Sequence, residues 1–170
     1  VPAHPIAGTE KNGAPAAFAE LYRGRTVIIT PQPGTSAPAL RLVRAAWQQC
    51  GARIVRLDAR EHDAIFAAVS HLPHVLAFAL VNALARRANA RILLGFSGGG
   101  LRDTVRIAGS SPEMWSDICI ANRDALLAAL DDYEDELERV RSAIESGDGA
   151  TLARMFGQAR AVRNKWLQRD

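Results

Sequence analysis

The histidines are the residues of this chain best suited to exchange a proton near neutral pH, because free histidine has a pKa of about 6.5. The chain has four: His4 in HPIAGTEK, His62 in EHD, and His71 and His74 in SHLPH. His4 follows an expected strand end and precedes a turn at Gly8, a place where α/β sheets bind ligands. The residues alone leave two readings of His4, a catalytic group or a loop histidine with local hydrogen bonds.

His71 and His74 are three residues apart and therefore share a helix face, with Asp63 and Ser70 placed near them by helical spacing. Two histidines and a carboxylate could bind a metal ion, but the spacing lacks the H-E-x-x-H pattern and an obvious third ligand. The alternative is a pair of polar residues that hydrogen-bond inside a helix kink. We predict no metal site.

Three consecutive glycines, at positions 98–100, precede the segment LRDTVR. Successive backbone N–H groups at the start of a helix attract anions. Arg106 follows two helical turns later, and a guanidinium can bind a carboxylate through two parallel hydrogen bonds. A structural ion pair of Arg106 with Asp103 or Glu10 is the alternative.

The first part of the chain must position His4, and its pattern alternates between helix and strand. Residues 14–22 predict a helix, residues 25–31 a strand, residues 39–51 a helix and residues 52–58 a second strand. Strand, helix, strand order favours parallel pairing. No Gly-x-Gly-x-x-Gly turn is present to bind a dinucleotide pyrophosphate. This part resembles the end of a larger α/β domain.

The rest of the chain shows helical periodicity and no convincing strand. Apolar residues at three- and four-residue steps predict a long helix over 61–88, kinked by Pro73. Its most apolar stretch, residues 72–85, is shorter than the ~20 residues that a bilayer requires. We therefore expect a buried core helix at 72–85 and no membrane association.

Two further helices are predicted towards the end of the chain. The apolar positions from Trp115 to Ile144 indicate one helix of about nine turns, and residues 149–168 indicate another that buries Phe156, Val162 and Trp166. A stripe this long favours contact with another subunit, with packing inside one chain as the alternative.

Composition excludes several classes of protein. The chain has 170 residues, 48% of them hydrophobic and 23% charged, which indicates one globular core or a core with a small lobe. The net charge of +3 is carried by dispersed residues, so nucleic-acid binding is not expected. Cys50 and Cys119 lack metal-ligand spacing and predict buried, reduced side chains in a cytoplasmic protein. The start of the sequence shows no signal-peptide pattern.

Five segments in one order resemble the prephenate dehydrogenase family over nearly the whole chain: HPIAGTEKNG, EHD, SHLPH, GGG followed by LRDTVRIA, and SPEMW. That family has an N-terminal Rossmann domain that binds NAD or NADP and a helical domain that dimerises. The resemblance implies a mainly α fold. Residues 1–58 would be a small α/β remnant of the Rossmann domain, and residues 59–170 a helical substrate-binding and dimerisation domain like the C-terminal domain of 6-phosphogluconate dehydrogenase.

The resemblance also implies a reaction: oxidative decarboxylation of prephenate to 4-hydroxyphenylpyruvate, with hydride transfer to NAD or NADP, in tyrosine biosynthesis. By similarity, His4 takes the proton of the ring hydroxyl as hydride leaves the same carbon. The implied substrate-binding residues are Arg106, His74, Thr9, Gly99, Gly100 and Trp115, the last from the partner subunit of a homodimer. The implied gating and supporting residues are Glu10, Lys11, Asp63, His71 and Asp103.

The chain departs from the family at Asn12, where serine is frequent, and this changes a loop hydrogen bond. The larger departure is the absence of the cofactor-binding glycines, so we expect the chain by itself to be inactive. The alternative function is a non-catalytic helical dimer that binds an aromatic ligand such as tyrosine for regulation. The sequence leaves open prephenate or arogenate as substrate, NAD or NADP as cofactor, and tyrosine as an inhibitor.

Overall fold

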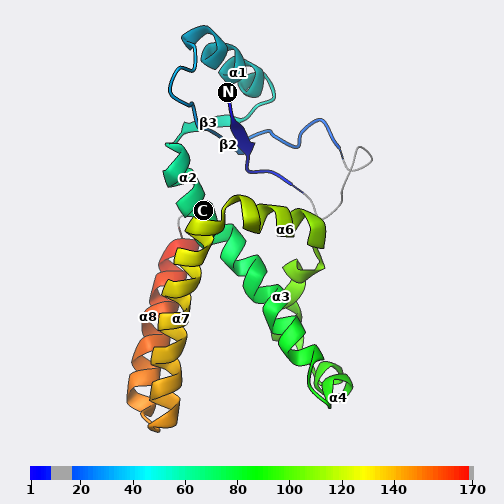
Figure 1. Ribbon diagram of the computed structural model, residues 1–170, viewed down its shortest axis with the longest axis vertical. Coiled ribbons are helices and arrows are strands. Elements are labelled where there is room, and N and C mark those ends of the chain that lie inside the picture. The colour runs from blue at the N-terminus through cyan, green and yellow to red at the C-terminus, as the bar shows by residue number, and fades with distance from the viewer. Residues whose placement is uncertain (9–16, 169–170) are drawn as a thin grey trace. The chain divides into compact units, whose positions relative to one another are not determined.

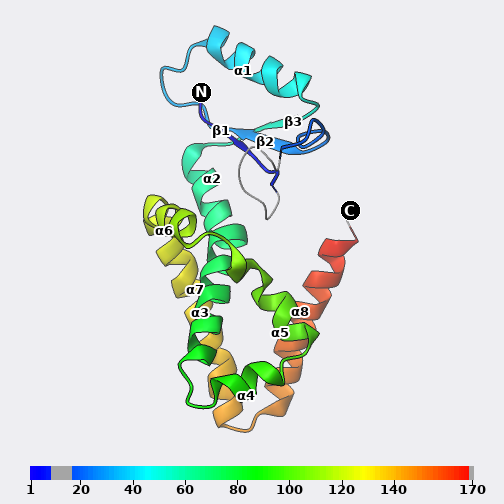
Figure 2. The same cartoon turned by 90° about the vertical axis from the view of Figure 1, so that its right-hand side faces the viewer.

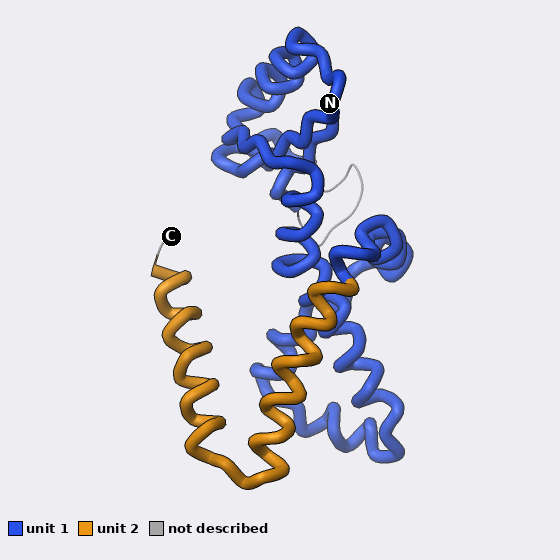
Figure 3. Tube along the Cα trace, turned by 60° about the vertical axis from the view of Figure 1, so that its left-hand side comes forward, with its two compact units in different colours: residues 1–126 blue, residues 127–170 orange. Residues whose placement is uncertain are grey.

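The computed structural model describes residues 1–8 and 17–168 (Figure 1). The chain is mainly helical with one small sheet near its start, as the sequence predicts. It forms two compact units, Val1–Leu126 and Leu127–Asp170 (Figure 3). The domain boundary expected at residue 58 stays a prediction.

The sheet has three strands in the order β1-β2-β3, which are Ala3–Pro5, Thr26–Ile29 and Arg53–Arg56. Strands β2 and β3 are parallel and are joined by helix α1, Ala37–Gln49, as expected. Helix α1 lies over one face of the sheet (Figure 2). Strand β1 pairs antiparallel with β2 and places His4 opposite Ile28. The sequence suggested that His4 follows a strand end, whereas His4 lies within β1.

The core of the sheet is the central strand β2. Its Val27 and Ile29 side chains share one face of the sheet and are 0% and 1% exposed, and Ile28 on the opposite face is 6% exposed. The helix predicted over 14–22 is wrong for its described part, since residues 19–24 form turns. These turns are fixed by an edge-on contact of Tyr22 with Trp47, whose ring centroids are 5.0 Å apart.

A long helical run follows β3, and its geometry changes in the middle. Helix α2, Ala59–Phe66, continues through a π-helical segment, Ala67–His71, into helix α3, Leu72–Ala85. Pro73 lies in the first turn of α3, where its missing N–H prevents the regular α-helical hydrogen bond. The irregularity that Pro73 predicts in this run is found as the π-helical segment directly before α3.

The prediction of a buried core helix over residues 72–85 is wrong for the single chain, because only Ala77 of α3 is buried. The run Ala59–Ala85 has 27 residues with a mean hydropathy of 1.9 in its most apolar window, 11% of which is buried. By length and composition alone, this run could cross a membrane; the absence of membrane association stays a prediction.

Shorter helices follow: α4, Ala90–Gly95; α5, Gly99–Val105; a 3₁₀ turn, Arg106–Gly109; and α6, Pro112–Ala121. The single helix predicted from Trp115 to Ile144 is wrong. It is broken at Asn122, whose φ of −111° and ψ of 34° are not helical, and α7 begins at Arg123.

The second unit consists of most of α7, Arg123–Glu145, and of α8, Gly149–Leu167. The two helices diverge from a turn at Gly147, which has a φ of +67° (Figure 3). The predicted burial of the α8 apolar residues is wrong for the single chain, since Phe156, Val162 and Trp166 are 58%, 70% and 65% exposed. The predicted burial of Cys50 is also wrong, because it is exposed.

Candidate active site

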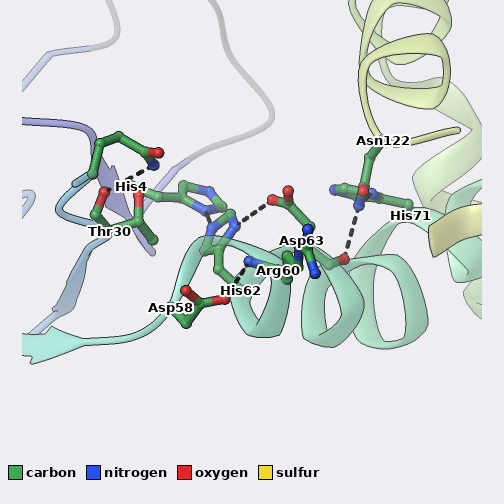
Figure 4. Close-up of polar contacts among 9 residues, drawn as sticks. His4, Thr30, Asp58, Arg60, His62, Asp63, His71 and Asn122 are labelled. Atoms are coloured by element: carbon green, nitrogen blue, oxygen red, sulfur yellow. Dashed lines mark hydrogen bonds and ion pairs between the residues drawn. The ribbon is translucent and has the colours of Figure 1, made fainter. Parts of the chain in front are cut away.

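His4 lies on the edge strand β1, next to the helix that follows β3 (Figure 4). The antiparallel pairing with β2 fixes its backbone. Its ring is half-buried against two side chains of α2, with centroid distances of 4.6 Å to Phe66 and 5.1 Å to His62. The sheet and α2 together therefore position this imidazole.

Two short polar contacts join His4 to a carboxylate (Figure 4). The Nδ1 atom of His4 is 2.8 Å from Nε2 of His62, and Nδ1 of His62 is 2.8 Å from Oδ1 of Asp63. The sequence predicted His4 and Asp63 as site residues but missed His62. The available signal was its place in the EHD segment, directly before Asp63.

The pKa of His4 is lowered, mainly because burial disfavours its charged form, and further by the nearby His62 and His71. Its imidazole is therefore neutral at pH 7. A neutral imidazole has one nitrogen with a free lone pair and can accept a proton. This is the protonation state that a general base requires.

His71 is connected to the same network by Asn122, the residue at the break between α6 and α7. The Nδ2 group of Asn122 donates to the backbone oxygen of Asp63 at 2.8 Å and to Nδ1 of His71 at 3.1 Å (Figure 4). The pKa of His71 is also lowered, first by burial and then by His62, with Asp63 opposing the shift. Asn122 falls inside the helix predicted from Trp115 to Ile144, so the sequence missed this role.

His74 points its Nδ1 donor at the backbone oxygen of Ser70, 2.9 Å away and one turn earlier. Its ring stacks on Trp115 of the same chain, with centroids 3.5 Å apart and planes 17° apart. Trp115 is 8% exposed, and its buried Nε1 has no hydrogen-bond partner within the described part of the chain. The resemblance implied Trp115 of the partner subunit at the site, whereas His74 stacks on Trp115 of its own chain.

The remaining predicted residues belong to other elements. Gly99 and Gly100 begin α5, Asp103 lies within it, and Arg106 begins the 3₁₀ turn rather than lying inside a helix. Both α5 and this turn pack against α3, the helix that contains His74. Thr9, Glu10, Lys11 and Asn12 lie outside the described residues.

A surface pocket of about 520 Å³ adjoins the network, and its lining includes Asp63 and Asn122 together with Arg60, Arg123 and Asp124. Among residues 1–8 and 17–168, no three histidine, cysteine or acidic side chains are grouped so that they could hold a metal ion. The chemistry that the described residues support is proton acceptance by His4.

Two family descriptions match the chain in succession. "Prephenate dehydrogenase, nucleotide-binding domain" matches residues 1–56, and "Prephenate dehydrogenase, dimerization domain" matches residues 58–158.

Curated relatives carry related names. A cyclohexadienyl dehydrogenase of Zymomonas mobilis is 39% identical over 96% of this chain and 56% of its own length. A prephenate dehydrogenase of Bacillus subtilis is 35% identical over 95% of this chain and 44% of its own length. The chain therefore spans about half the length of the curated relatives it matches.

Solved structures share the fold. The prephenate dehydrogenase of Aquifex aeolicus in complex with hydroxyphenyl propionate and NAD⁺ has a TM-score of 0.87 and 35% identity, over 99% of this chain and 58% of that one. An arogenate dehydrogenase of Synechocystis has a TM-score of 0.84 and 29% identity, over 96% of this chain and 60% of that one.

Proposed function

Because the chain belongs to the prephenate dehydrogenase family, we propose that the whole protein converts prephenate to 4-hydroxyphenylpyruvate by oxidative decarboxylation. The single observation that carries this proposal is the half-buried imidazole of His4, which contacts His62 at hydrogen-bond distance and whose pKa is lowered mainly by burial. It has the chemistry that removal of a proton from the substrate hydroxyl requires.

In the proposed reaction, Nε2 of His4 accepts the proton of the ring hydroxyl while hydride leaves the same ring carbon. Loss of the ring carboxylate as CO₂ supplies the electron pair that makes the ring aromatic. The phenolic oxygen of the product then recovers the proton from His4. The protein thus needs a base that can hold a proton briefly and return it, which suits an imidazole.

A nicotinamide cofactor, when bound, accepts the hydride. The unit β2-α1-β3 is one parallel β-α-β element of the kind that builds dinucleotide-binding domains, and residues 1–56 match such a domain. The sequence has no glycine-rich phosphate turn. These residues fit only part of a cofactor site. We propose that the other part is formed by a region that the relatives have and that this chain does not span. The choice between NAD and NADP would be made there.

We assign substrate orientation to the helical part of the chain. Arg106 would bind a substrate carboxylate through its guanidinium, and the stacked pair His74 and Trp115 would border the ring. The other residues proposed to line or gate the pocket are Thr9, Gly99, Gly100, Glu10, Lys11, Asp63, His71 and Asp103. Prephenate is the proposed substrate and arogenate the nearest competitor.

We also propose a cytoplasmic homodimer. Support comes from the match to a dimerisation domain and from the exposed apolar side chains of α8, such as Phe156 and Trp166. A second copy of the chain would cover these side chains, which water solvates poorly.

The proposal is tested by incubating the whole protein with prephenate or arogenate and with NAD or NADP. We expect reduced cofactor, CO₂ and 4-hydroxyphenylpyruvate in equal amounts with prephenate. No cofactor reduction in any of the four combinations would refute the proposal. Saturable tyrosine binding without any turnover would instead favour the regulatory dimer.

A further inference from the structure

We propose that His62 is a positioning residue that fixes the tautomer of His4 and thereby decides which of its nitrogens is the base. This inference rests on the proposed function of His4. It concerns a residue that touches His4 rather than the substrate.

The first step concerns the proton of His62. Its Nδ1 atom is 2.8 Å from Oδ1 of Asp63. An ionised carboxylate only accepts hydrogen bonds, so the Nδ1 atom of His62 must carry a proton. If Nδ1 carried no proton, its lone pair would lie 2.8 Å from the lone pairs of the carboxylate oxygen, and the two would repel each other. In neutral His62, Nε2 is consequently an acceptor.

The second step transfers this constraint to His4. Its Nδ1 atom lies 2.8 Å from Nε2 of His62, and one proton must lie between the two nitrogens. Since Nε2 of neutral His62 is the acceptor, Nδ1 of His4 is the donor. The lone pair of His4 is then on Nε2, the nitrogen directed away from His62.

The third step is that the His4 ring cannot easily rotate so that its two nitrogens change places. Phe66 lies 4.6 Å from the ring centroids of both His4 and His62, so it contacts both imidazoles. Rotation of the His4 ring would break the bond to His62 and leave a half-buried donor without its partner. A doubly protonated His62 would instead donate to His4 and force its proton onto Nε2, the wrong arrangement for a base.

The test compares His62→Phe, which keeps a ring beside Phe66 but has no acceptor, with His62→Gln, whose amide oxygen can accept from His4. The first readout is the ¹⁵N signals of the imidazoles in the whole protein, with His4→Asn used for assignment. We expect the Nδ1–H form of His4 in the wild type and in His62→Gln, and its loss in His62→Phe. A wild-type His4 with its proton on Nε2 would overturn the inference, whether or not prephenate is oxidised.

The second readout separates positioning from folding. We expect His62→Phe to lower kcat on prephenate roughly 10- to 100-fold, the usual loss when an orienting partner is removed, with KM changed less than about twofold. His62→Gln should recover most of kcat. Wild-type kcat in His62→Phe, or an equal loss in both variants, would contradict a positioning role. If the wild type oxidises no prephenate, the proposed function fails and the ¹⁵N signals alone decide the inference.

Discussion

The two compact units of this chain, coloured separately in Figure 3, differ in the contacts of their polar side chains. In the unit 1–126, contacts of His4 with His62 and of Asn122 with Asp63 join segments 58 and 59 positions apart. In residues 127–168, the side-chain hydrogen bonds and ion pairs all join positions at most four apart, such as Arg141 with Glu145. The first pattern fixes a tertiary arrangement, whereas the second stabilises individual helices.

The two units also differ in how far they bury their apolar side chains. The first unit buries both faces of β2, with Val27 and Ile29 on one face and Ile28 on the other, although it also exposes large apolar side chains such as Val69 and Phe96. The second unit buries Ala143 and leaves large apolar side chains exposed: Leu127, Leu137, Ile144, Phe156, Val162, Trp166 and Leu167. We infer that the first unit is organised to position reacting groups and the second to associate.

The largest effect is expected from His4→Asn, which removes the proposed base. The variant should lower kcat by about 10²- to 10⁴-fold, the usual worth of a positioned base, while substrate binding changes far less. Steady-state kinetics of the whole protein with prephenate provide the measurement. Glu136→Gln, an exposed change in the second unit, is the control and should leave kcat unchanged. Near-normal turnover in His4→Asn would remove this residue from the mechanism.

The associative role of the second unit is tested by Val162→Glu, because this side chain is 70% exposed on α8 among other apolar residues. Burying an unpaired carboxylate in an interface is costly, so light scattering at micromolar concentration should change from two chain masses to one. Arg141→Gln on α7 is the matched control and should stay dimeric. A wild type with one chain mass would contradict the association.

A smaller effect is expected from Asn122→Ala, which removes the hydrogen bonds to Asp63 and His71. These hydrogen bonds are exposed or partly buried, so their loss should lower the free energy of unfolding by about 0.5–1.5 kcal/mol, measured by denaturant titration. Asn164→Ala, an exposed change on α8, should alter it by less than about 0.5 kcal/mol. Equal changes in the free energy of unfolding for Asn122→Ala and Asn164→Ala would show that the hydrogen bonds of Asn122 contribute nothing to stability.

The smallest effect concerns pH. The pKa of His4 is lowered from 6.5, first by burial and then by His62 and His71. The acidic fall in kcat/KM, which reports groups of the substrate-free enzyme, should therefore be centred below pH 6.5, and a midpoint above that value would contradict the prediction. Between the folded and unfolded pKa values, the unfolded chain binds more protons at this residue. The contribution of His4 to the free energy of unfolding is therefore present above pH 6.5, and it is lost as the pH falls from 6.5 through the lowered pKa of the folded state. The His4→Asn variant should not show this loss.

The sequence pattern predicted those parts of the fold that depend on residues close together in the chain. The β-branched run around Val27 and the proline in SHLPH were sufficient for the parallel strand pair and the helix irregularity. The sequence placed a strand end before His4 but missed the position and the antiparallel pairing of β1, because three residues carry little pattern and the pairing with β2 is non-local. The exposure of α3 and α8 was missed because a row of apolar residues looks the same in the sequence whether residues of the same chain or of a second chain cover it.

The candidate site was predicted in part. The predicted residues His4, Asp63 and His71 lie in one network. Trp115, which the resemblance implied would come from the partner subunit, stacks on His74 of the same chain. His62 and Asn122 were missed because their partners are more than fifty positions away. Helical spacing relates residues three or four apart, so it could not reveal these contacts.

The most direct test of the central claim is a crystal structure of the whole protein with NAD and a hydroxyphenyl carboxylate ligand. We predict Nε2 of His4 within about 3 Å of the ring hydroxyl, the distance needed for proton transfer, and the guanidinium of Arg106 on the carboxylate of the same ligand. A ligand whose hydroxyl lies away from His4, or whose carboxylate binds elsewhere than Arg106, would contradict the account.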